Sequence, residues 1–209
     1  MDLPLIPADL ALLDVLDGAI DVEGKIGGAV ASLQPLEGRD VLLLGADRGV
    51  RRAQLEALGA RVKAIGDEAP SGLEAVPAAS ADALVAFWTG LGLGPAAEPA
   101  TLAALSRVAR PGGRILLIET YGRDDTSQLF DDPARERRLT SANDRRGTML
   151  GADFRVRVVH CWWTFADAEA LTDTLERLFP ATGAAVAATL RRPRVSFKVA
   201  VYHRLVEES

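Results

Sequence analysis

The chain has few of the residues that build metal centres and disulfides. Its 209 residues include one cysteine, Cys161, and two histidines, His160 and His203. A single cysteine excludes an internal disulfide and a cysteine-based zinc site. The two histidines lie too far apart in the sequence for a histidine-rich metal motif. We therefore expect no bound metal.

Lysine is scarce as well, and the chain lacks any excess of positive charge. It has three lysines, Lys25, Lys63 and Lys198, and a formal net charge of −5. This balance argues against a nucleic-acid-binding footprint over the whole surface, although it leaves room for a local basic patch. We therefore expect no nucleic-acid partner.

Long apolar runs are also absent. No stretch approaches the roughly 20 apolar residues that a membrane span requires. The first residues include acids such as Asp2 and Asp9, and they lack the basic segment that begins a signal peptide. These features predict a cytoplasmic protein without a membrane partner.

What the sequence does have is a glycine corner between an apolar strand and a helix. Residues 41–44 are all apolar, which is typical of a central parallel strand covered on both faces. Gly45 and Gly49 bound the turn that follows, and the next segment predicts a helix over 48–58 that ends at Gly59. Doubly wound α/β proteins bind nucleotide-like ligands at such a turn, although glycine also suits a tight turn without a ligand.

Strands and helices alternate along most of the chain. This alternation is typical of a doubly wound α/β sheet with helices on both faces. Residues 66–80 read as a loop with room for a short strand, and 180–193 read as a loop. Gly24, Gly27 and Gly28 mark a break in the first helical segment. The predicted strands are 41–44, 61–65, 83–87, 114–118, 154–163 and 195–203, and the predicted helices are 8–34, 48–58, 100–109, part of 134–150, and 166–178.

Two further segments carry a family resemblance. Residues 80–87 begin a strand with Ser-x-Asp, and residues 105–117 contain Arg-Pro-Gly-Gly-Arg before an apolar strand. With the glycine corner, they make the chain similar to class I S-adenosylmethionine-dependent methyltransferases, and to a small bacterial subgroup with a degenerate first motif. The resemblance covers residues 38–120 well and 150–205 loosely. It implies a Rossmann-like, doubly wound, mostly parallel sheet with an antiparallel last strand.

The resemblance also implies a domain plan and a ligand. The cofactor would be S-adenosylmethionine and the partner a small-molecule substrate, and a homodimer stays open. The chain would form a single methyltransferase-like domain over 1–209, with an N-terminal helical extension over 1–37, a cofactor-binding core over 38–120, and a C-terminal part over 121–209 that holds the sixth and seventh strands.

Three positions depart from the family's pattern around the cofactor. Leu43 stands where an acid commonly precedes the first glycine, Asp47 replaces the middle glycine, and Gly66 stands where an acid commonly ends the second strand. The link from the second strand to Asp82 is short, although a third strand can still be fitted at 72–77. Asp47 could cap the following helix, contact the ammonium group of the cofactor, or repel its carboxylate.

Four further residues are candidates for holding the cofactor. Gly45 and Gly49 would let the backbone approach the methionine part, with helix N–H groups facing its carboxylate. Asp67 and Glu68 follow the second strand at its carboxyl end, where a ribose-binding acid belongs. A solvated loop charge is the alternative role for these two acids.

Aromatic side chains and one histidine are candidates for the methyl-transfer step. Phe87 and Trp88 end a strand and could line the cleft and stabilise a sulfonium by cation–π contact, with core packing favoured for Phe87 and Trp88 the more open. Tyr121 follows the fifth strand of the family's pattern and could donate a hydrogen bond or act as a general base. His160 is a second candidate base, and the alternative is a packed histidine with one satisfied nitrogen.

Substrate-binding candidates lie in the loop after that strand and near the chain's tryptophan pair. Arg123 could bind an acidic substrate group or pair with an aspartate, and Asp124 lies beside it in the same polar loop. Trp162 and Trp163 alternate faces of a strand, so one belongs in the core and the other at a cleft or interface. We take Trp163 as the substrate contact.

Two functions follow from these observations. The first is a methyltransferase acting on a small molecule, a reaction that depends mainly on positioning and needs few catalytic residues. The second is a methyltransferase-fold protein that has lost cofactor binding and serves as a binding or scaffold module, which Leu43, Asp47 and Gly66 favour. A nicotinamide-dependent oxidoreductase ranks behind both because the Gly-x-Gly-x-x-Gly pattern fails at Asp47 and Val50.

Overall fold

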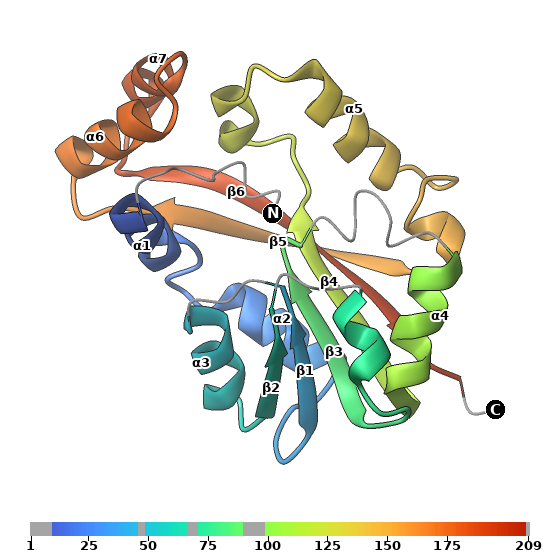
Figure 1. The fold of residues 1–209 in the computed structure, drawn as a ribbon. Coiled ribbons are helices and arrows are strands. Elements are labelled where there is room, and N and C mark those ends of the chain that lie inside the picture. The colour runs from blue at the N-terminus through green and yellow to red at the C-terminus, as the bar shows by residue number, and fades with distance from the viewer. Residues whose placement is uncertain (1–9, 46–48, 67–70, 90–98, 208–209) are drawn as a thin grey trace.

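The computed structural model describes residues 10–45, 49–66, 71–89 and 99–207. Within these ranges six strands form one sheet: β1 Asp40–Leu44, β2 Arg61–Ile65, β3 Ala81–Phe87, β4 Ala109–Thr120, β5 Arg155–Thr164 and β6 Arg194–Leu205. Their order is β2-β1-β3-β4-β6-β5 (Figure 1). β1 to β4 are parallel, and β6 runs antiparallel between β4 and β5. The Rossmann-like, mostly parallel α/β sheet with an antiparallel last strand is confirmed.

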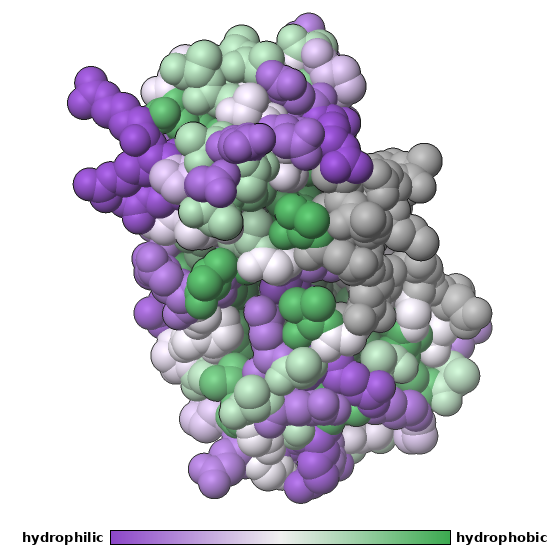
Figure 2. All heavy atoms as spheres, turned by 90° about the vertical axis from the view of Figure 1, so that its left-hand side faces the viewer, coloured by the Kyte–Doolittle hydropathy of each residue, from purple (hydrophilic) through white to green (hydrophobic). Residues whose placement is uncertain are grey.

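Helices cover both faces of this sheet, as predicted (Figure 1). No helix within the described ranges is long and apolar enough to cross a membrane. On the side of the molecule that carries α6, α1 and α3, apolar side chains lie scattered among charged ones (Figure 2). The α-helices are α1 Leu10–Ala19, α2 Lys25–Leu33, α3 Val50–Ala57, α4 Pro99–Val108, α5 Pro133–Ala142, α6 Ala168–Leu178 and α7 Gly183–Thr189, and the 3-10 helices are η1 Ser71–Ala75, η3 Asp125–Leu129 and η4 Leu150–Ala152.

The sheet separates two apolar cores. The first core lies under α1, α2, α3, α6 and α7, and the second core lies under η1 and α4. β1 contributes to both, since Val41 and Leu43 lie in the first core while Leu42 and Leu44 lie in the second. Successive side chains of a strand point to opposite faces, so a strand covered on both faces needs apolar residues at every position. This burial explains the uninterrupted apolar run of β1.

The predicted helical segment 8–34 is two helices with a short connection between them. Asp21, with a φ of 56°, caps the second helix, because its carboxylate accepts the backbone N–H groups of Lys25 and Ile26 at 2.8 and 2.7 Å. Ile20 forms a single antiparallel bridge with Trp163 of β5. The connection therefore covers part of an edge strand, which would otherwise expose its backbone to other chains.

The third strand fitted at 72–77 is wrong. Residues 71–75 form η1 instead, so β2 is an edge of the sheet. Arg107 of α4 explains the difference, because its guanidinium donates to the carbonyls of Leu73 and Val76 at 2.6 and 2.8 Å. The Arg107 side chain thus satisfies backbone carbonyls that would otherwise accept hydrogen bonds from a neighbouring strand.

The segment 180–193, predicted as a loop, contains α7. This helix packs tightly on α6, since a Cβ on Gly183 would lie 2.1 Å from the carbonyl oxygen of Leu175. Val186 fills the first core beneath α7. The helix is therefore stabilised by tertiary packing, which a short Ala-rich stretch does not reveal in isolation.

Two family-like motifs meet at the amino end of the sheet, opposite the carboxyl ends of the parallel strands. The carboxylate of Asp82 accepts the backbone N–H of Asp40 at 2.8 Å and pairs with the Arg110 guanidinium at 2.9 Å. Arg110 also pairs with the Asp40 carboxylate at 3.0 Å. Burial alone would raise the pKa of Asp82, but the Asp40 N–H and Arg110 hold it below its ordinary value. The Ser-x-Asp and Arg-Pro-Gly-Gly segments therefore share a structural role here.

Replacing Asp82 by asparagine should destabilise the protein by about 1–3 kcal/mol, because a charge-assisted acceptor is lost. The pKa of Asp82 is lowered on folding, so its contribution is present above its unfolded pKa of about 3.9 and disappears as the pH falls through the folded value. Urea unfolding at pH 7 and below pH 3 measures both effects. The exposed Asp173→Asn is the control, with an expected change under about 0.5 kcal/mol. Equal stability of D82N and the wild type at pH 7 would contradict this role.

Candidate functional site

The predicted site lies at the point in the sheet where the connections that leave two neighbouring strands go to opposite faces. β1 sits between β2 and β3. The chain leaves β1 through α3 on the first-core face, and it leaves β3 towards α4 on the second-core face. In open α/β sheets, ligands bind beyond the carboxyl ends of the strands at this kind of switch point. The arrangement brings Gly45, Gly49, Phe87 and Trp88 to one end of the sheet.

Gly45 is required at the corner by a close neighbour. Its φ is 97°, and a Cβ there would lie 2.4 Å from the Cγ2 methyl of Thr89, just beyond β3. Its N–H donates to the carbonyl of Ile65 at 3.0 Å, which ties the corner to β2. Any other residue at position 45 would have to move Thr89 and strain its own backbone.

Gly49 is different, since it also has a positive φ but has open space around it. It caps the amino end of α3 with a φ of 99° and is exposed. Among the described residues, no neighbouring atom lies within 4 Å of a Cβ built on it. The backbone here can therefore be approached closely by a ligand at the start of α3.

Three of the predicted cofactor residues, Asp47, Asp67 and Glu68, lie outside the described residues. Of the two other departures from the family's pattern, Leu43 is buried in the first core. Gly66 is exposed directly after β2. The Leu43 side chain therefore packs in the first core, beneath the helices.

Trp88 is not the more open of the two aromatic residues at the end of β3. It is 3% exposed, against 8% for Phe87, and both rings lie in the first core. A regular strand would alternate them, but Trp88 has a φ of 49°, which ends the alternation. Its ring lies 6.2 Å from that of Phe197 and has the Arg51 guanidinium 4.8 Å from its centre. A sulfonium placed over the Trp88 ring would therefore compete with the Arg51 guanidinium for the same cation–π contact.

Arg51 lies beside the two aromatic rings of the candidate site, a position that the sequence did not reveal. It is buried in α3, lies 5.6 Å from the ring centre of Phe87, and pairs with Asp17 of α1 at 3.6 Å. Its Nη1 donates to Gln54 at 3.0 Å. In the sequence Arg51 looks the same as the exposed Arg52 beside it, and only the helix orientation distinguishes them.

Tyr121 lies at the end of β4 beside a buried polar cluster. It is half-buried, and its carbonyl accepts from the amide of Asn143 at 3.1 Å. The Tyr202 hydroxyl donates to the same Asn143 at 2.6 Å. Burial, followed by the nearby Glu119 carboxylate, raises the pKa of Tyr202 above its ordinary value. Glu119 is fully buried at the end of β4, and the sequence analysis did not select it.

His160 lies on the edge strand β5 and is exposed. It is in register with Lys198 of β6, whose carbonyl accepts the N–H of Tyr121 at 2.9 Å. Two strand spacings, about 10 Å, therefore separate the His160 and Tyr121 backbones. The two candidate bases lie at the same level of the sheet but are not neighbours.

The loop after β4 brings Arg123 and Asp124 against β6. Arg123 is exposed with a φ of 59°, and its carbonyl accepts from Nζ of Lys198 at 2.6 Å. The Asp124 carboxylate caps η3 through the N–H of Ser127 at 3.2 Å and accepts the Lys198 N–H at 2.5 Å. Asp124 therefore uses both carboxylate oxygens to hold this loop, while the Arg123 side chain faces solvent.

The tryptophan pair of β5 alternates as predicted, and Trp163, the predicted substrate contact, is the buried member. Trp163 is 1% exposed, and its ring lies 6.4 Å from Phe179 and 5.6 Å from Phe197. Trp163 therefore packs in the first core. Trp162 is the partly exposed member, with the Arg194 guanidinium 4.2 Å from its ring centre.

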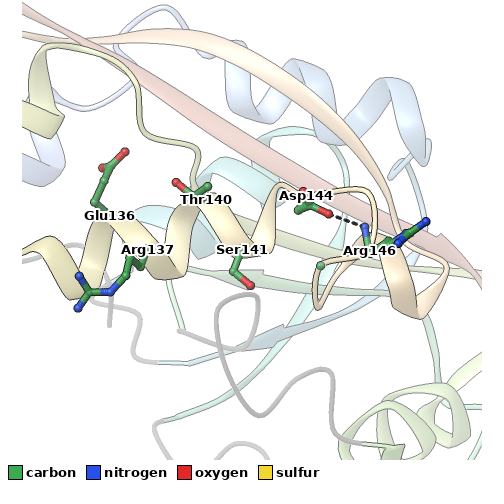
Figure 3. Close-up of a pocket in the computed structure, with 7 residues that line it drawn as sticks. Glu136, Arg137, Thr140, Ser141, Asp144 and Arg146 are labelled. Carbon is green, nitrogen blue, oxygen red and sulfur yellow. Dashed lines mark hydrogen bonds between the residues drawn. The ribbon is translucent and has the colours of Figure 1, made fainter.

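A separate hollow lies along α5. It has a volume of about 410 Å³, and Figure 3 shows its lining side chains on α5 and the turn that follows. The described lining residues all fall within 136–147, so none comes from the carboxyl end of a strand. Among the described residues, no cluster of three or more histidine, cysteine, aspartate or glutamate side chains could hold a metal ion.

Comparison with known proteins gives matches to solved structures alone. No protein-family model and no curated protein matches the sequence. An S-adenosylmethionine-dependent methyltransferase from Aquifex aeolicus is 18% identical with a TM-score of 0.49, covering 94% of this chain and 99% of that chain. Another from Archaeoglobus fulgidus is 13% identical with a TM-score of 0.43, covering 84% and 92%.

A third similar structure is phosphoethanolamine N-methyltransferase 2 from Haemonchus contortus, in complex with phosphomonomethylethanolamine and S-adenosylhomocysteine. It is 10% identical with a TM-score of 0.49, covering 90% of this chain and 54% of that chain. Likenesses at this level carry no inference about activity, so the functional argument rests on this chain's own strand order and residues.

Alanine substitutions at the two glycines should separate crowding from backbone strain. Gly49→Ala should cost about 1–2 kcal/mol from its positive φ alone, while Gly45→Ala should cost about 1–3 kcal/mol more because of Thr89. Thr89→Ser removes the Cγ2 methyl and keeps the hydroxyl, so it should recover part of the G45A loss. Urea unfolding of the single and double variants measures this coupling. Equal losses for G45A and G49A, with no recovery, would show that Thr89 does not crowd the corner.

Proposed function

We propose that this chain is an S-adenosylmethionine-dependent methyltransferase that acts on a small molecule, as a single methyltransferase-like domain over 1–209. The glycine corner at the switch between β1 and β3 carries this proposal. A ligand site is expected there from strand order alone, and Gly49 leaves the start of α3 open to close approach. The Arg-Pro-Gly-Gly segment and the antiparallel β6 support the same family.

The residues present fit the carboxylate end of this cofactor. Helix N–H groups at the start of α3 would face its carboxylate, next to Gly45 and Gly49. Asp67 and Glu68, after β2, would hold the ribose hydroxyls. Asp47 takes the role of ammonium partner in this proposal, since Leu43 is buried. The bound cofactor supplies a methyl group on a sulfonium, and the protein's task is to position the acceptor in line with it.

Tyr121 is the candidate for assisting the acceptor. It follows β4 directly and lies one strand from the end of β3, whereas His160 lies two strands further from β3. Its phenol could donate a hydrogen bond to the acceptor or take its proton. Arg123, exposed beside it, is available to an acidic group of the substrate. The acceptor's identity is left to experiment.

A scaffold protein without cofactor is the rival function. The observations that favour it are the core position of Leu43 and the edge position of β2, which has no further strand beside it among the described residues. A missing strand shortens the wall that would cover the adenine. The two functions predict opposite results in a titration with the cofactor.

Calorimetric titration with S-adenosylmethionine and S-adenosylhomocysteine tests the proposal. We expect Kd values below about 100 µM, which corresponds to about −5.5 kcal/mol. Methylthioadenosine, which lacks the carboxylate and ammonium groups, should bind more weakly if α3 and Asp47 hold those groups. Asp47→Asn should also weaken binding of the full cofactor.

Two outcomes would favour the rival. Absence of heat with the wild type and with Asp47→Gly would reject cofactor binding altogether. Binding that appears in Asp47→Gly but not in the wild type would identify Asp47 as a residue that repels the cofactor carboxylate, as expected for two like charges about 4 Å apart.

A further inference from the structure

Among the buried side-chain polar atoms that lack a hydrogen-bond partner in the described part of the chain, two lie at the carboxyl ends of β3 and β4. They are the indole Nε1 of Trp88 and the hydroxyl of Thr120. Trp88 is 3% exposed and Thr120 is 1% exposed. Buried polar groups in folded proteins are almost always paired, because an unsatisfied one raises the free energy of the folded state. Both atoms therefore need an explanation.

The strand register brings these two side chains to one place. The backbone N–H of Trp88 donates to the carbonyl of Ile118 at 2.8 Å, two residues before Thr120 in β4. Thr120 pairs in register with Val199, a residue of the first core, so its side chain points to that core. The Trp88 ring stacks on Phe197, two residues from Val199 on the same face. Both atoms thus belong to one aromatic region beyond β3 and β4.

The chemistry of this region favours one kind of ligand. An indole N–H can only donate, and a threonine hydroxyl can donate as well, so the missing partner is an acceptor. The Trp88 and Phe197 rings stack on each other, 6.2 Å apart at 28°, so a ligand here would lie against aromatic surface beside the pair and not between the rings. The Arg51 guanidinium over Trp88 adds a positive charge, which favours an acceptor with negative charge.

We propose that Trp88 and Thr120 bind the methyl-accepting substrate, a small planar molecule that presents a carboxylate to these two donors. The assignment rests on the proposed function for its methyl-transfer role, but the binding site itself does not. Thr120 and Trp88 act here as substrate-binding residues, and the carboxylate is the anchor that fixes the substrate at the ends of β3 and β4.

Because Trp88 and Thr120 are buried, entry of a substrate requires part of the first core to move. Leu16 of α1 lies in the same core as Trp88, and Asp17 of α1 pairs with Arg51 at 3.6 Å. The Asp17 side chain is 24% exposed and that of Arg51 is 7% exposed, so separating the two charges carries a cost.

The stability of threonine-to-valine variants tests whether the Thr120 hydroxyl is unsatisfied. Thr126 is the matched control, because it is equally buried and its hydroxyl donates to Asp124 at 2.6 Å. We expect Thr126→Val to lower the Tm by about 3 °C or more, and Thr120→Val to leave the Tm unchanged or raise it. An equal fall in both variants would mean that the Thr120 hydroxyl is already paired, for example with a buried water, and would overturn the proposal.

Binding of benzoate tests the ligand class. We expect the wild type to bind benzoate and Thr120→Val to bind it at least tenfold more weakly, while Thr120→Ser, which keeps the hydroxyl, retains most of the affinity. Cyclohexanecarboxylate, which is not planar, should bind less well than benzoate. No benzoate binding by the wild type, or equal binding by T120V, would overturn the proposal.

The titration is run with and without S-adenosylhomocysteine, which separates this proposal from the function it extends. Benzoate binding that depends on Thr120 without any cofactor binding supports the site and rejects the methyltransferase. Cofactor binding without benzoate binding supports the methyltransferase and rejects the site. The Tm comparison needs no ligand, so it stands in either case.

Discussion

The order of the three strands β2-β1-β3 is the constraint on which both the fold and the candidate site depend. β1 shares its backbone hydrogen bonds between two parallel neighbours, so the connections that leave β1 and β3 must diverge to opposite faces. That divergence opens space beyond β1, and the chain needs glycine there because Thr89, just beyond β3, lies against the corner. One pairing pattern therefore fixes where a ligand can bind and which residue must stand at position 45.

The amino end of the sheet carries charged hydrogen bonds that stabilise the fold, and the carboxyl end carries the candidate site. Asp82 and Arg110 hold the amino end through charged hydrogen bonds, and the length of β3 places Asp82 roughly 20 Å from Trp88 at the carboxyl end. The Ser-x-Asp and Arg-Pro-Gly-Gly segments therefore stabilise the sheet itself, independently of any ligand at its other end. Trp88, Thr120 and Arg51 lie at the other end and leave polar or charged groups inside an aromatic region, a stability cost that is typical of binding sites.

Much of the fold could be predicted from the sequence because burial on both faces leaves a clear pattern. Val41–Leu44 and the strand that begins near Asp82 are examples. The third strand was wrong because Arg107 satisfies the carbonyls of Leu73 and Val76, and such a long-range contact has no local signature. The site was predicted less well. Trp88 turned inward because of its positive φ, and Thr120 and Arg51 differ from ordinary strand and helix residues only through their tertiary neighbours.

An experimental structure of the chain with S-adenosylhomocysteine tests the central claim most directly, since that claim is about location. The account predicts the ligand at the carboxyl end of β1, with its carboxylate at the start of α3 and its backbone neighbours at Gly45 and Gly49. A ligand bound instead in the hollow along α5, or crystals that stay free of ligand at saturating concentration, would contradict it.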